Sequence, residues 1–404
     1  MADRLGIYLH IPFCQSKCHY CDFVSGVFPS SLMDPYLDAL KHEVRSVQTV
    51  LDTVGVKEGL PDSLQVDSVY LGGGTPSFIP ARQILELIDC LQSHFEILPE
   101  AEITLEVNPG SVSSSKIRVY QEAGINRISL GMQAFQDEML QRIGRSHTVE
   151  EGLSTLALFR EAGFENISLD AIAGLPGQSA GEWQETLDRL QQLGPEHLSV
   201  YLLEVHENTM FGRIYGQAKG EGRPAHSASE FPGLPDEELL EHFYLDAVRQ
   251  LSLAGYHHYE ISNFCRPGYE SRHNLKYWTD QPYLGFGCSA CSYVGGWRWG
   301  NERSPSKYVQ RVRETSQAVE SVVGLSETDR QEEAIFLGLR VIPGLDLRLF
   351  QSRFGYDFVQ KFSLPIHHLA DCGLLESSPE RVRLTPRGAL LSNEVFTELM
   401  RCAW

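Results

Sequence analysis

Three cysteines near the N-terminus have the spacing of a set of metal ligands. Cys14, Cys18 and Cys21 form a C-x3-C-x2-C pattern directly after an apolar run that ends at Ile11. Thiolates at this spacing can surround one iron–sulfur centre, and a strand that ends just before them would present them at its tip. A zinc site built from four cysteines would need a second pair at a comparable spacing, and none follows nearby. A cluster held by only three cysteines keeps one iron free for another ligand.

Two other interpretations of the cysteines remain open, namely three unrelated buried thiols and a structural zinc or iron–sulfur module. Cys288 and Cys291 form a second C-x2-C pattern, which has no partner pair at zinc spacing and follows no βαβ redox pattern. For this second pair the sequence predicts two packed thiols.

The composition describes a globular protein of two or three domains, since 404 residues with 42% hydrophobic content can bury a proper core. A net charge of -19 excludes a general nucleic-acid surface, which needs clustered Lys and Arg. No apolar run reaches the roughly 18 residues of a spanning helix, and the first residues lack a signal-peptide pattern. Together with the intact cysteine triplet, this predicts a cytoplasmic protein in a reducing compartment, without stable membrane insertion.

Short apolar runs alternate with longer helical patterns up to about residue 260, which predicts an α/β fold with a parallel sheet of βα units. Six units would curve into a partial (βα)6 barrel of the TIM type, with the chemistry at the carboxyl ends of the strands. The six predicted strands are 5–10, 66–71, 103–107, 127–130, 166–172 and 197–203.

Glycines or polar residues follow these strands one after another. The second strand ends in the glycine run 72–74, where backbone groups can approach a ligand closely, followed by Thr75. Glu106, Gln133 and Asp170 lie at the ends of the next three strands. Each residue alone could cap a helix or face water, but their recurrence predicts one shared pocket.

The predicted organisation is a barrel core over 1–215, a flexible loop or insertion over 216–236, a core extension over 237–330 and a small winged-helix-like domain over 331–404. The last domain should contain helices near 332–338 and 367–372 and a turn and wing at 382–388. From Arg340 onward there are eight basic against seven acidic residues, so no basic face is expected and a protein or domain contact is favoured over DNA.

The core extension contains the sequence His273-Asn274-Leu275-Lys276-Tyr277-Trp278. We predict a loop whose aromatic side chains could contact a large flat ligand, with a neutral histidine that could bind iron. The alternative is an aromatic loop that packs one domain on another.

Taken together, these residues resemble the HemN/HemW branch of the radical S-adenosylmethionine (SAM) family, from residues 8–14 through 72–77 to 384–386. The resemblance covers nearly the whole chain. It implies a [4Fe-4S] cluster on Cys14, Cys18 and Cys21, with SAM chelating the open iron. An electron donor protein would then supply the electron that cleaves SAM to a 5'-deoxyadenosyl radical.

The same resemblance implies roles for individual positions. Contacts to the cluster-bound SAM would come from Tyr8, Gly73, Gly74, Thr75 and Glu106, the neighbouring cavity would be lined by Tyr20, Gln133, Arg145 and Asp170, and haem would contact His273, Asn274, Tyr277 and Trp278.

Two activities occur in this branch. The oxygen-independent coproporphyrinogen III oxidases carry a further cysteine two residues after the third ligand and a long N-terminal arm. In this sequence Phe23 stands at that position and only thirteen residues precede Cys14. Both departures, and the motif at 273–278, favour a haem chaperone that passes haem to an acceptor such as a respiratory enzyme. Oxidative decarboxylation remains the alternative. Cys288 and Cys291 depart from the chaperone pattern, in which a small residue and a histidine are more frequent.

Overall fold

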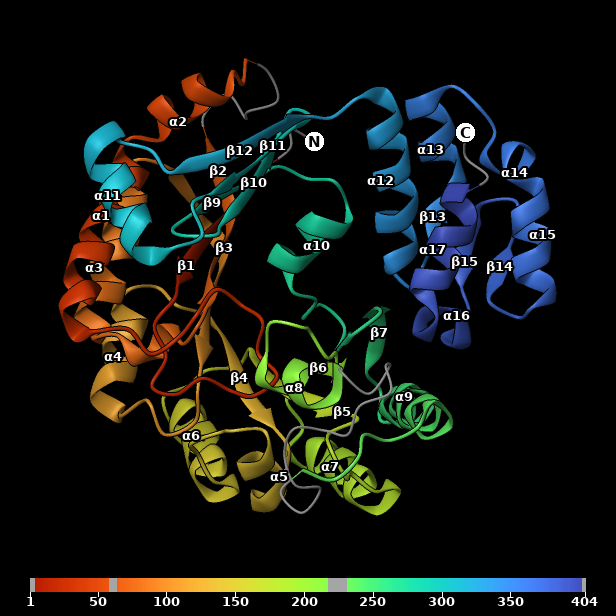
Figure 1. Cartoon of the computed structure of the whole chain (residues 1–404), viewed down its shortest axis with the longest axis horizontal. Helices are drawn as coiled ribbons and strands as arrows, with labels where there is room; N and C mark the ends of the chain where they lie inside the picture. Colours follow the sequence, from red (N-terminus) through yellow and green to blue (C-terminus); the bar gives the residue numbers. More distant parts are fainter. Residues whose placement is uncertain (1–3, 58–63, 217–230, 402–404) are drawn as a thin grey trace.

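Six parallel strands curve into a half barrel that forms the main body of the protein (Figure 1). The computed structural model describes residues 4–57, 64–216 and 231–401. Neighbouring strands in the barrel are also neighbours in the sequence, and all six predicted strands are confirmed. Their bounds are β1 (Leu5–Ile11), β2 (Gln65–Gly73), β3 (Glu96–Val107), β4 (Arg127–Gln133), β5 (Ile167–Ala173) and β6 (His197–Leu202).

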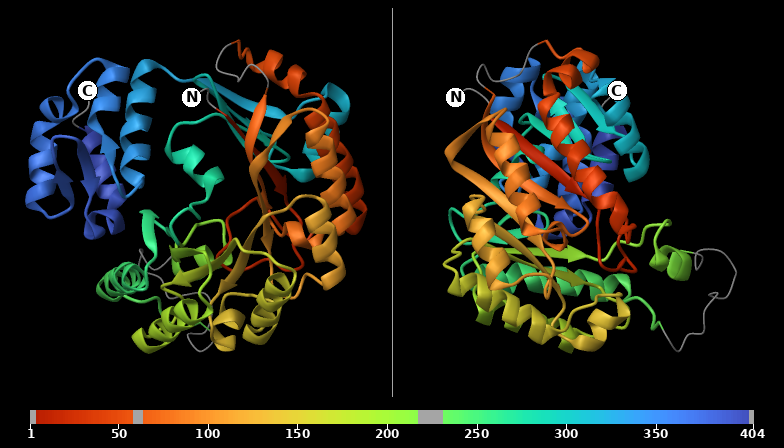
Figure 2. Two further views of the ribbon diagram at one scale, coloured as in Figure 1. Left: turned by 180° about the vertical axis from the view of Figure 1, so that it is seen from behind. Right: turned by 90° about the vertical axis from the view of Figure 1, so that its left-hand side faces the viewer.

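Helices cover the outside of the half barrel, as the two further views show (Figure 2). Local signals set several of their starts: Thr148 and Ser179, for example, each begin a helix with a complete capping box. The outer helices are α1 (Met33–Arg45), α2 (Val47–Val54), α3 (Ala81–Gln92), α4 (Ser114–Glu122), α5 (Asp137–Arg142), α6 (Val149–Glu161), α7 (Ala180–Leu193) and α9 (Glu237–Leu253), with short 3-10 turns η1 (Ser30–Leu32) and η2 (Pro76–Phe78). Helix α8 (Met210–Tyr215) lies beside the cysteine loop, where Phe211 N donates to His19 O at 2.9 Å.

Each barrel strand has one apolar face and one polar face, because side chains alternate along a strand. In β1, Leu5, Ile7, Leu9 and Ile11 are fully buried in the main core, whereas the alternate positions face the inside of the barrel. The inner face is mostly polar. It includes Ser68, Tyr70, Glu102, Thr104, Glu106, Arg127, Ser129, Ser168, Asp170, His197 and Ser199, many of which are hydrogen-bonded to one another.

Further strands widen the sheet on both sides of the barrel to twelve strands in the order β12-β11-β10-β9-β1-β2-β3-β4-β5-β6-β8-β7. Strand β9 pairs in parallel with β1, and the outer strands are antiparallel. The added elements are β7 (His257–Glu260), β8 (Asn263–Cys265), α10 (Arg272–Trp278), β9 (Tyr283–Phe286), β10 (Cys291–Val294), β11 (Trp297–Asn301), α11 (Pro305–Thr315) and β12 (Val319–Gly324).

The predicted loop at 273–278 is wrong, because these residues form helix α10. The side chain of Ser271 caps the helix by accepting a hydrogen bond from the backbone N–H of Asn274 at 3.4 Å. Most of the predicted insertion at 216–236 lies outside the described residues. Across the described part of the chain, no helix is both long and apolar enough to cross a bilayer.

A separate C-terminal domain, blue in Figure 1, lies beside the half barrel and has its own apolar core. The predicted turn and wing at 382–388 are confirmed only in part. Residues 382–384 lie in the three-stranded sheet β13-β15-β14, but residues 386–388 begin a helix. The elements are α12 (Glu327–Arg340), β13 (Leu345–Asp346), α13 (Leu347–Phe354), α14 (Phe358–Lys361), α15 (Ser363–Asp371), β14 (Leu375–Ser377), β15 (Arg381–Leu384), α16 (Pro386–Leu390) and α17 (Ser392–Arg401).

A buried carboxyl group ties the β9–β10 turn to the outer helices. Glu43 of α1 accepts hydrogen bonds from Gly287 N at 2.8 Å, Tyr308 Oη at 2.7 Å and Asn301 Nδ2 at 2.7 Å. Burial raises the pKa of Glu43 to about 7, although these donors favour its charged form.

Only one thiol of the second C-x2-C pattern is packed as predicted. Cys288 is fully buried beside the hydroxyl of Tyr36, whereas Cys291 is exposed at the start of β10. The prediction of two packed thiols is therefore wrong for Cys291.

Replacing Glu43 with alanine should lower the free energy of unfolding by about 3 kcal/mol, because three buried donors lose their acceptor. Chemical denaturation of the cluster-free protein measures this, with exposed Glu161→Ala as the matched control. The unfolded carboxyl loses its proton near pH 4.5, but the folded one keeps it to about pH 7. The parent should therefore lose stability relative to Glu43→Gln as the pH rises through this window. Equal stabilities of parent and Glu43→Ala would contradict the assignment.

Candidate functional site

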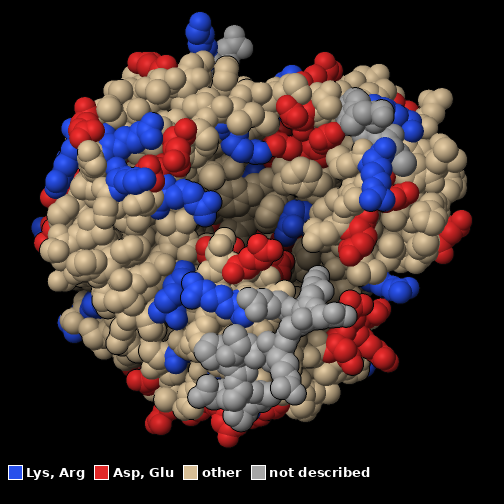
Figure 3. Space-filling view, viewed as in Figure 1, with Lys and Arg blue, Asp and Glu red and all other residues tan. Residues whose placement is uncertain are grey.

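A cavity of about 550 Å³ opens at the carboxyl ends of the barrel strands, beside the cysteine loop. This volume is in the usual range for small-molecule sites, roughly 300–1,000 Å³. Figure 3 shows the molecule hollowed near the middle of this face, with charged side chains around the mouth. Of the predicted site residues, Cys14, Cys18, Tyr20, Cys21, Gly73, Gly74, Thr75, Glu106, Gln133, Arg145 and Asp170 line the cavity.

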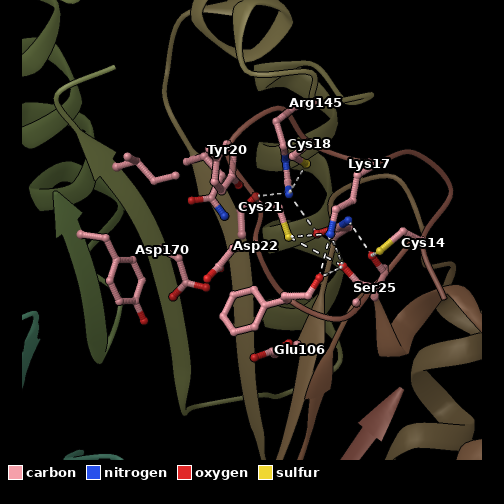
Figure 4. A pocket seen from close by; sticks show the side chains of 18 of the residues that line it. Cys14, Lys17, Cys18, Tyr20, Cys21, Asp22, Ser25, Glu106, Arg145 and Asp170 are labelled. Carbon is pink, nitrogen blue, oxygen red and sulfur yellow. Dashed lines mark hydrogen bonds between the residues drawn. The ribbon is translucent and has the colours of Figure 1, made fainter. Parts of the chain in front are cut away.

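The three cysteines lie on one loop, and each sulfur accepts a hydrogen bond (Figure 4). The donors are Thr75 Oγ1 to Cys14 at 3.7 Å, Arg145 Nη1 to Cys18 at 3.8 Å and Lys17 Nζ to Cys21 at 3.5 Å. Burial raises the pKa of the Cys14 thiol, and the hydrogen bond from Thr75 opposes this effect.

The arrangement of the thiols fits an iron–sulfur cluster. Within residues 4–57, 64–216 and 231–401, no three His, Cys, Asp or Glu side chains surround one point closely enough to hold a single ion. The three thiols nevertheless open onto one cavity. Such a set suits a cluster of several irons, in which each thiolate binds a different iron.

Gly73, the last residue of β2, and Gly74 lie so close to neighbouring residues that a side chain would not fit at either position. Gly73 has a φ of 115°, and a Cβ there would lie 2.6 Å from the ring of His10. At Gly74 a Cβ would lie 2.9 Å from Cys14 Sγ and 2.8 Å from the carbonyl carbon of Pro12. Gly74 therefore allows the cysteine loop to pack against the end of β2.

Two partly buried carboxyl groups, Glu106 and Asp170, face the cavity from the strands, opposite the cysteines (Figure 4). Burial raises the pKa of Glu106 to about 7, although Tyr70 Oη and Gly73 N donate hydrogen bonds to it at 2.9 and 3.0 Å. Burial also raises the pKa of Asp170, whose carboxylate accepts hydrogen bonds from Ser129 Oγ at 3.0 and 3.2 Å. An ammonium group bound at either carboxyl group would stabilise its charged form.

Strain marks the end of β4. Gln133 has a φ of 66°, which is unusual for a residue with a side chain, and the pairing with β5 shifts between Gly131 and Gln133. Arg145 braces this turn by donating to Gly131 O at 2.7 Å and Asn108 Oδ1 at 3.0 Å. The same guanidinium group thus links the strained strand end to Cys18.

Sequence reasoning missed several residues of the site. Tyr70 follows the period-two polar pattern of β2, so alternation was an available signal for it. For the mouth of the cavity no local signal exists, because the loops that bring its residues together are far apart in the chain. These residues include Lys17, Ser25, Tyr201, Glu204 and His206.

The remaining predicted residues lie outside the cavity. The side chain of His273 is 1% exposed, and its ring nitrogens are hydrogen-bonded to Ser68 Oγ at 3.1 Å and Tyr277 Oη at 2.9 Å. Neither nitrogen is free to bind iron. Trp278 lies under the guanidinium group of Arg340 at 4.3 Å. Tyr8 and Asn274 do not line the cavity either; the ring of Tyr8 stacks on that of His273.

Comparisons with known proteins agree with this architecture. A model of the Radical SAM superfamily matches residues 8–190, and one of the HemN C-terminal domain matches 325–391. The heme chaperone HemW of Bacillus subtilis is 35% identical over 96% of this chain and 97% of its own length. The chain belongs to the HemW family. The heme chaperone HemW of Escherichia coli is 36% identical over 71% of this chain and 69% of its own length.

Membership of the HemW family confirms the predicted resemblance, and a solved relative confirms the fold. The coproporphyrinogen III oxidase HemN of Escherichia coli, described as a radical SAM enzyme, superposes with a TM-score of 0.80 at 25% identity. The match covers 98% of this chain and 90% of that protein. The HemW family fold is thus the radical SAM α/β barrel with a C-terminal domain.

Adding a methyl group at Gly74 should displace Cys14 and lower the iron bound after anaerobic reconstitution at least several-fold. The control is Gly181→Ala in α7, where the nearest atom to an added Cβ is 3.9 Å away. Iron and sulfide analysis measures both variants. Parent-like iron content in Gly74→Ala would show that the cysteine loop does not depend on this contact.

Proposed function

We propose that the protein is a haem chaperone that holds a [4Fe-4S] cluster and SAM in the cavity and passes haem to an acceptor protein. One observation carries this proposal: three thiols, a strand end with two glycines and a partly buried carboxyl group share one cavity, in a chain whose relatives are named heme chaperones. We further propose that it acts in the cytoplasm with an electron donor protein, and that the acceptor is a respiratory enzyme or another haem protein.

In this proposal, Cys14, Cys18 and Cys21 hold the cluster, which supplies an open iron and an electron for SAM cleavage when it is bound. The carboxylate of Glu106 accepts a hydrogen bond from the ammonium group of SAM. The backbone N–H of Gly73 donates to the same carboxylate at 3.0 Å and helps to hold it in place. Because the pKa of Glu106 is raised to about 7, the arriving cation favours loss of its proton. Arg145 places a positive charge beside Cys18 and donates a hydrogen bond to its sulfur at 3.8 Å.

The cargo site is not assigned to the side chain of His273, since both ring nitrogens of this residue are already engaged. The proposal of haem binding rests instead on the similarity to the heme chaperones HemW. A haem site needs apolar walls and an axial donor. A histidine other than His273 can supply the donor. His206 at the rim of the cavity is one candidate; its side chain is partly exposed, and its Nε2 lies 3.4 Å from Glu204 and 3.6 Å from Asp22.

Oxidative decarboxylation of coproporphyrinogen III is the second candidate, because the HemN oxidase shares the fold over nearly the whole chain. Against it stands Phe23, 65% exposed at the cavity, at the position where the oxidases carry a further cysteine.

Replacing Cys18 with alanine should abolish the brown colour of the reconstituted protein and its paramagnetic resonance signal after reduction, since one cluster ligand is lost. Cys372→Ala, which changes an exposed thiol in the C-terminal domain, should keep both. Haem binding should survive in both variants. An intact cluster in Cys18→Ala would remove the basis of the assignment.

Titration of the parent protein with haem should produce a Soret band that saturates at a defined stoichiometry. Anaerobic incubation with coproporphyrinogen III, SAM and a reductant should yield no protoporphyrinogen IX at a useful rate. Chromatography of the extracted porphyrins measures this second result. Steady turnover without haem binding would make the decarboxylase the primary function.

A further inference from the structure

Helix α10 lies at the amino-terminal ends of the barrel strands, the end away from the cysteines. Its first two backbone N–H groups, those of Arg272 and His273, both donate to the carboxylate of Glu102 on β3 at 3.2 Å. Lys276 is buried and donates through Nζ to Arg4 O at 2.9 Å. We call residues 271–278 the barrel plug.

The barrel plug packs against the barrel strands as closely as a core element does. A Cβ on Gly6 of β1 would lie 2.7 Å from Lys276 Cδ and 3.3 Å from His273 Cε1. Ser68 of β2 is fully buried and bonded to His273. The glycine at position 6 is thus explained by the plug, and β1 and β2 are shaped to receive it.

A short chain of contacts leads from the barrel plug to the cavity. The ring of His273 lies 5.4 Å from that of Tyr70 and 6.4 Å from that of Tyr8, measured between centroids. Tyr70 also donates a hydrogen bond from its hydroxyl to Glu106 at 2.9 Å. Any movement of the His273 ring therefore changes the packing of the donor that holds Glu106.

A second chain of hydrogen bonds reaches the other carboxyl group. Ser271 N, at the start of the barrel plug, donates to Tyr259 Oη at 3.2 Å. From there the bonds run from Tyr259 to His197 at 2.8 Å, from His197 to Ser168 at 2.8 Å, and from Ser168 to Asp170 at 3.2 Å. Both cavity carboxyl groups are therefore connected to the plug through buried side chains.

We propose that the barrel plug positions the two carboxyl groups of the SAM pocket, and that His273 is a positioning residue acting through Tyr70 on Glu106 rather than an axial ligand of haem. This inference rests on the proposed binding of SAM in the cavity. It links the 273–278 motif to the cofactor site by contacts that pass entirely through the inside of the barrel.

The pH dependence of SAM binding reports on this positioning. Loss of the Tyr70 donor destabilises charged Glu106, so its pKa rises and the acid limb of binding moves to higher pH. The alkaline limb, set by the ammonium group of SAM itself, stays in place. The other titratable or charged groups that act on Glu106 from the surrounding elements are Tyr8, Arg127, Asp170, Tyr201 and Tyr277.

The test compares Tyr70→Phe, His273→Ala and Ser68→Ala in reconstituted protein. The control is Tyr120→Phe, which removes a buried hydroxyl that has no hydrogen-bond partner, on α4 outside the barrel. SAM affinity is measured from pH 6 to 9 by the change in the absorption spectrum of the oxidised cluster, which does not cleave SAM. Haem affinity is measured in parallel by Soret absorbance.

Tyr70→Phe should weaken SAM binding about tenfold near neutral pH, the usual effect of losing one hydrogen bond to a charged group, and shift the acid limb upward. His273→Ala and Ser68→Ala should shift the limb in the same direction and keep the haem affinity of the parent. Tyr120→Phe should match the parent throughout.

Either of two results would overturn the inference. The first is an acid limb that stays unchanged in both His273→Ala and Ser68→Ala, whether or not haem binding is kept. The second is loss of haem binding in His273→Ala, which would make His273 a haem ligand. If His273→Ala does not fold, an unchanged limb in Ser68→Ala is sufficient. Failure of the parent itself to bind SAM is a different outcome, since it removes the proposed function first and the inference with it.

Discussion

The polar inner face of the half barrel is the constraint on which the rest of the structure depends. Strands β1 to β6 bury their apolar side chains under the outer helices, so the alternate polar side chains must point into the lumen. Polar groups removed from water need hydrogen-bond partners, and unpaired charges are costlier still. The polar side chains of the lumen are accordingly hydrogen-bonded to one another and to groups at its two ends.

The two ends are filled in different ways. At the amino-terminal ends of the strands the polar groups pair with helix α10. Its first N–H groups donate to Glu102, and His273 is hydrogen-bonded to Ser68. At the carboxyl ends of the strands the lumen opens into the cavity, where the pKa of Glu106 is raised and the backbone of Gln133 is left-handed. Raised pKa values and backbone strain are tolerated where a ligand interaction compensates for them. The two ends are connected because Tyr70 touches both.

Much of the fold was predictable because its signals are local. The strand positions follow from alternation and apolar runs, and the spacing of the three cysteines by itself indicates a cluster. Helix α10 was not predictable, since seven residues make a weak helical pattern and its partners lie far away in sequence, on β1, β2 and β3. The wrong prediction for Cys291 has a similar reason, because a C-x2-C spacing does not show which of its two thiols the turn exposes to solvent. The predicted wing is wrong at 386–388 because Thr385 caps a helix that begins at Pro386.

The role of the cavity also depends on long-range packing. Gly74 brings the cysteine loop against β2, and Arg145 connects that loop to the strained end of β4. The proposed function requires that the three thiols leave one iron open and that SAM binds to it. Mössbauer spectroscopy of protein reconstituted with ⁵⁷Fe tests this directly. Adding SAM should change the isomer shift of one iron in each cluster and leave the others unchanged; a spectrum unaffected by saturating SAM would contradict the proposed function.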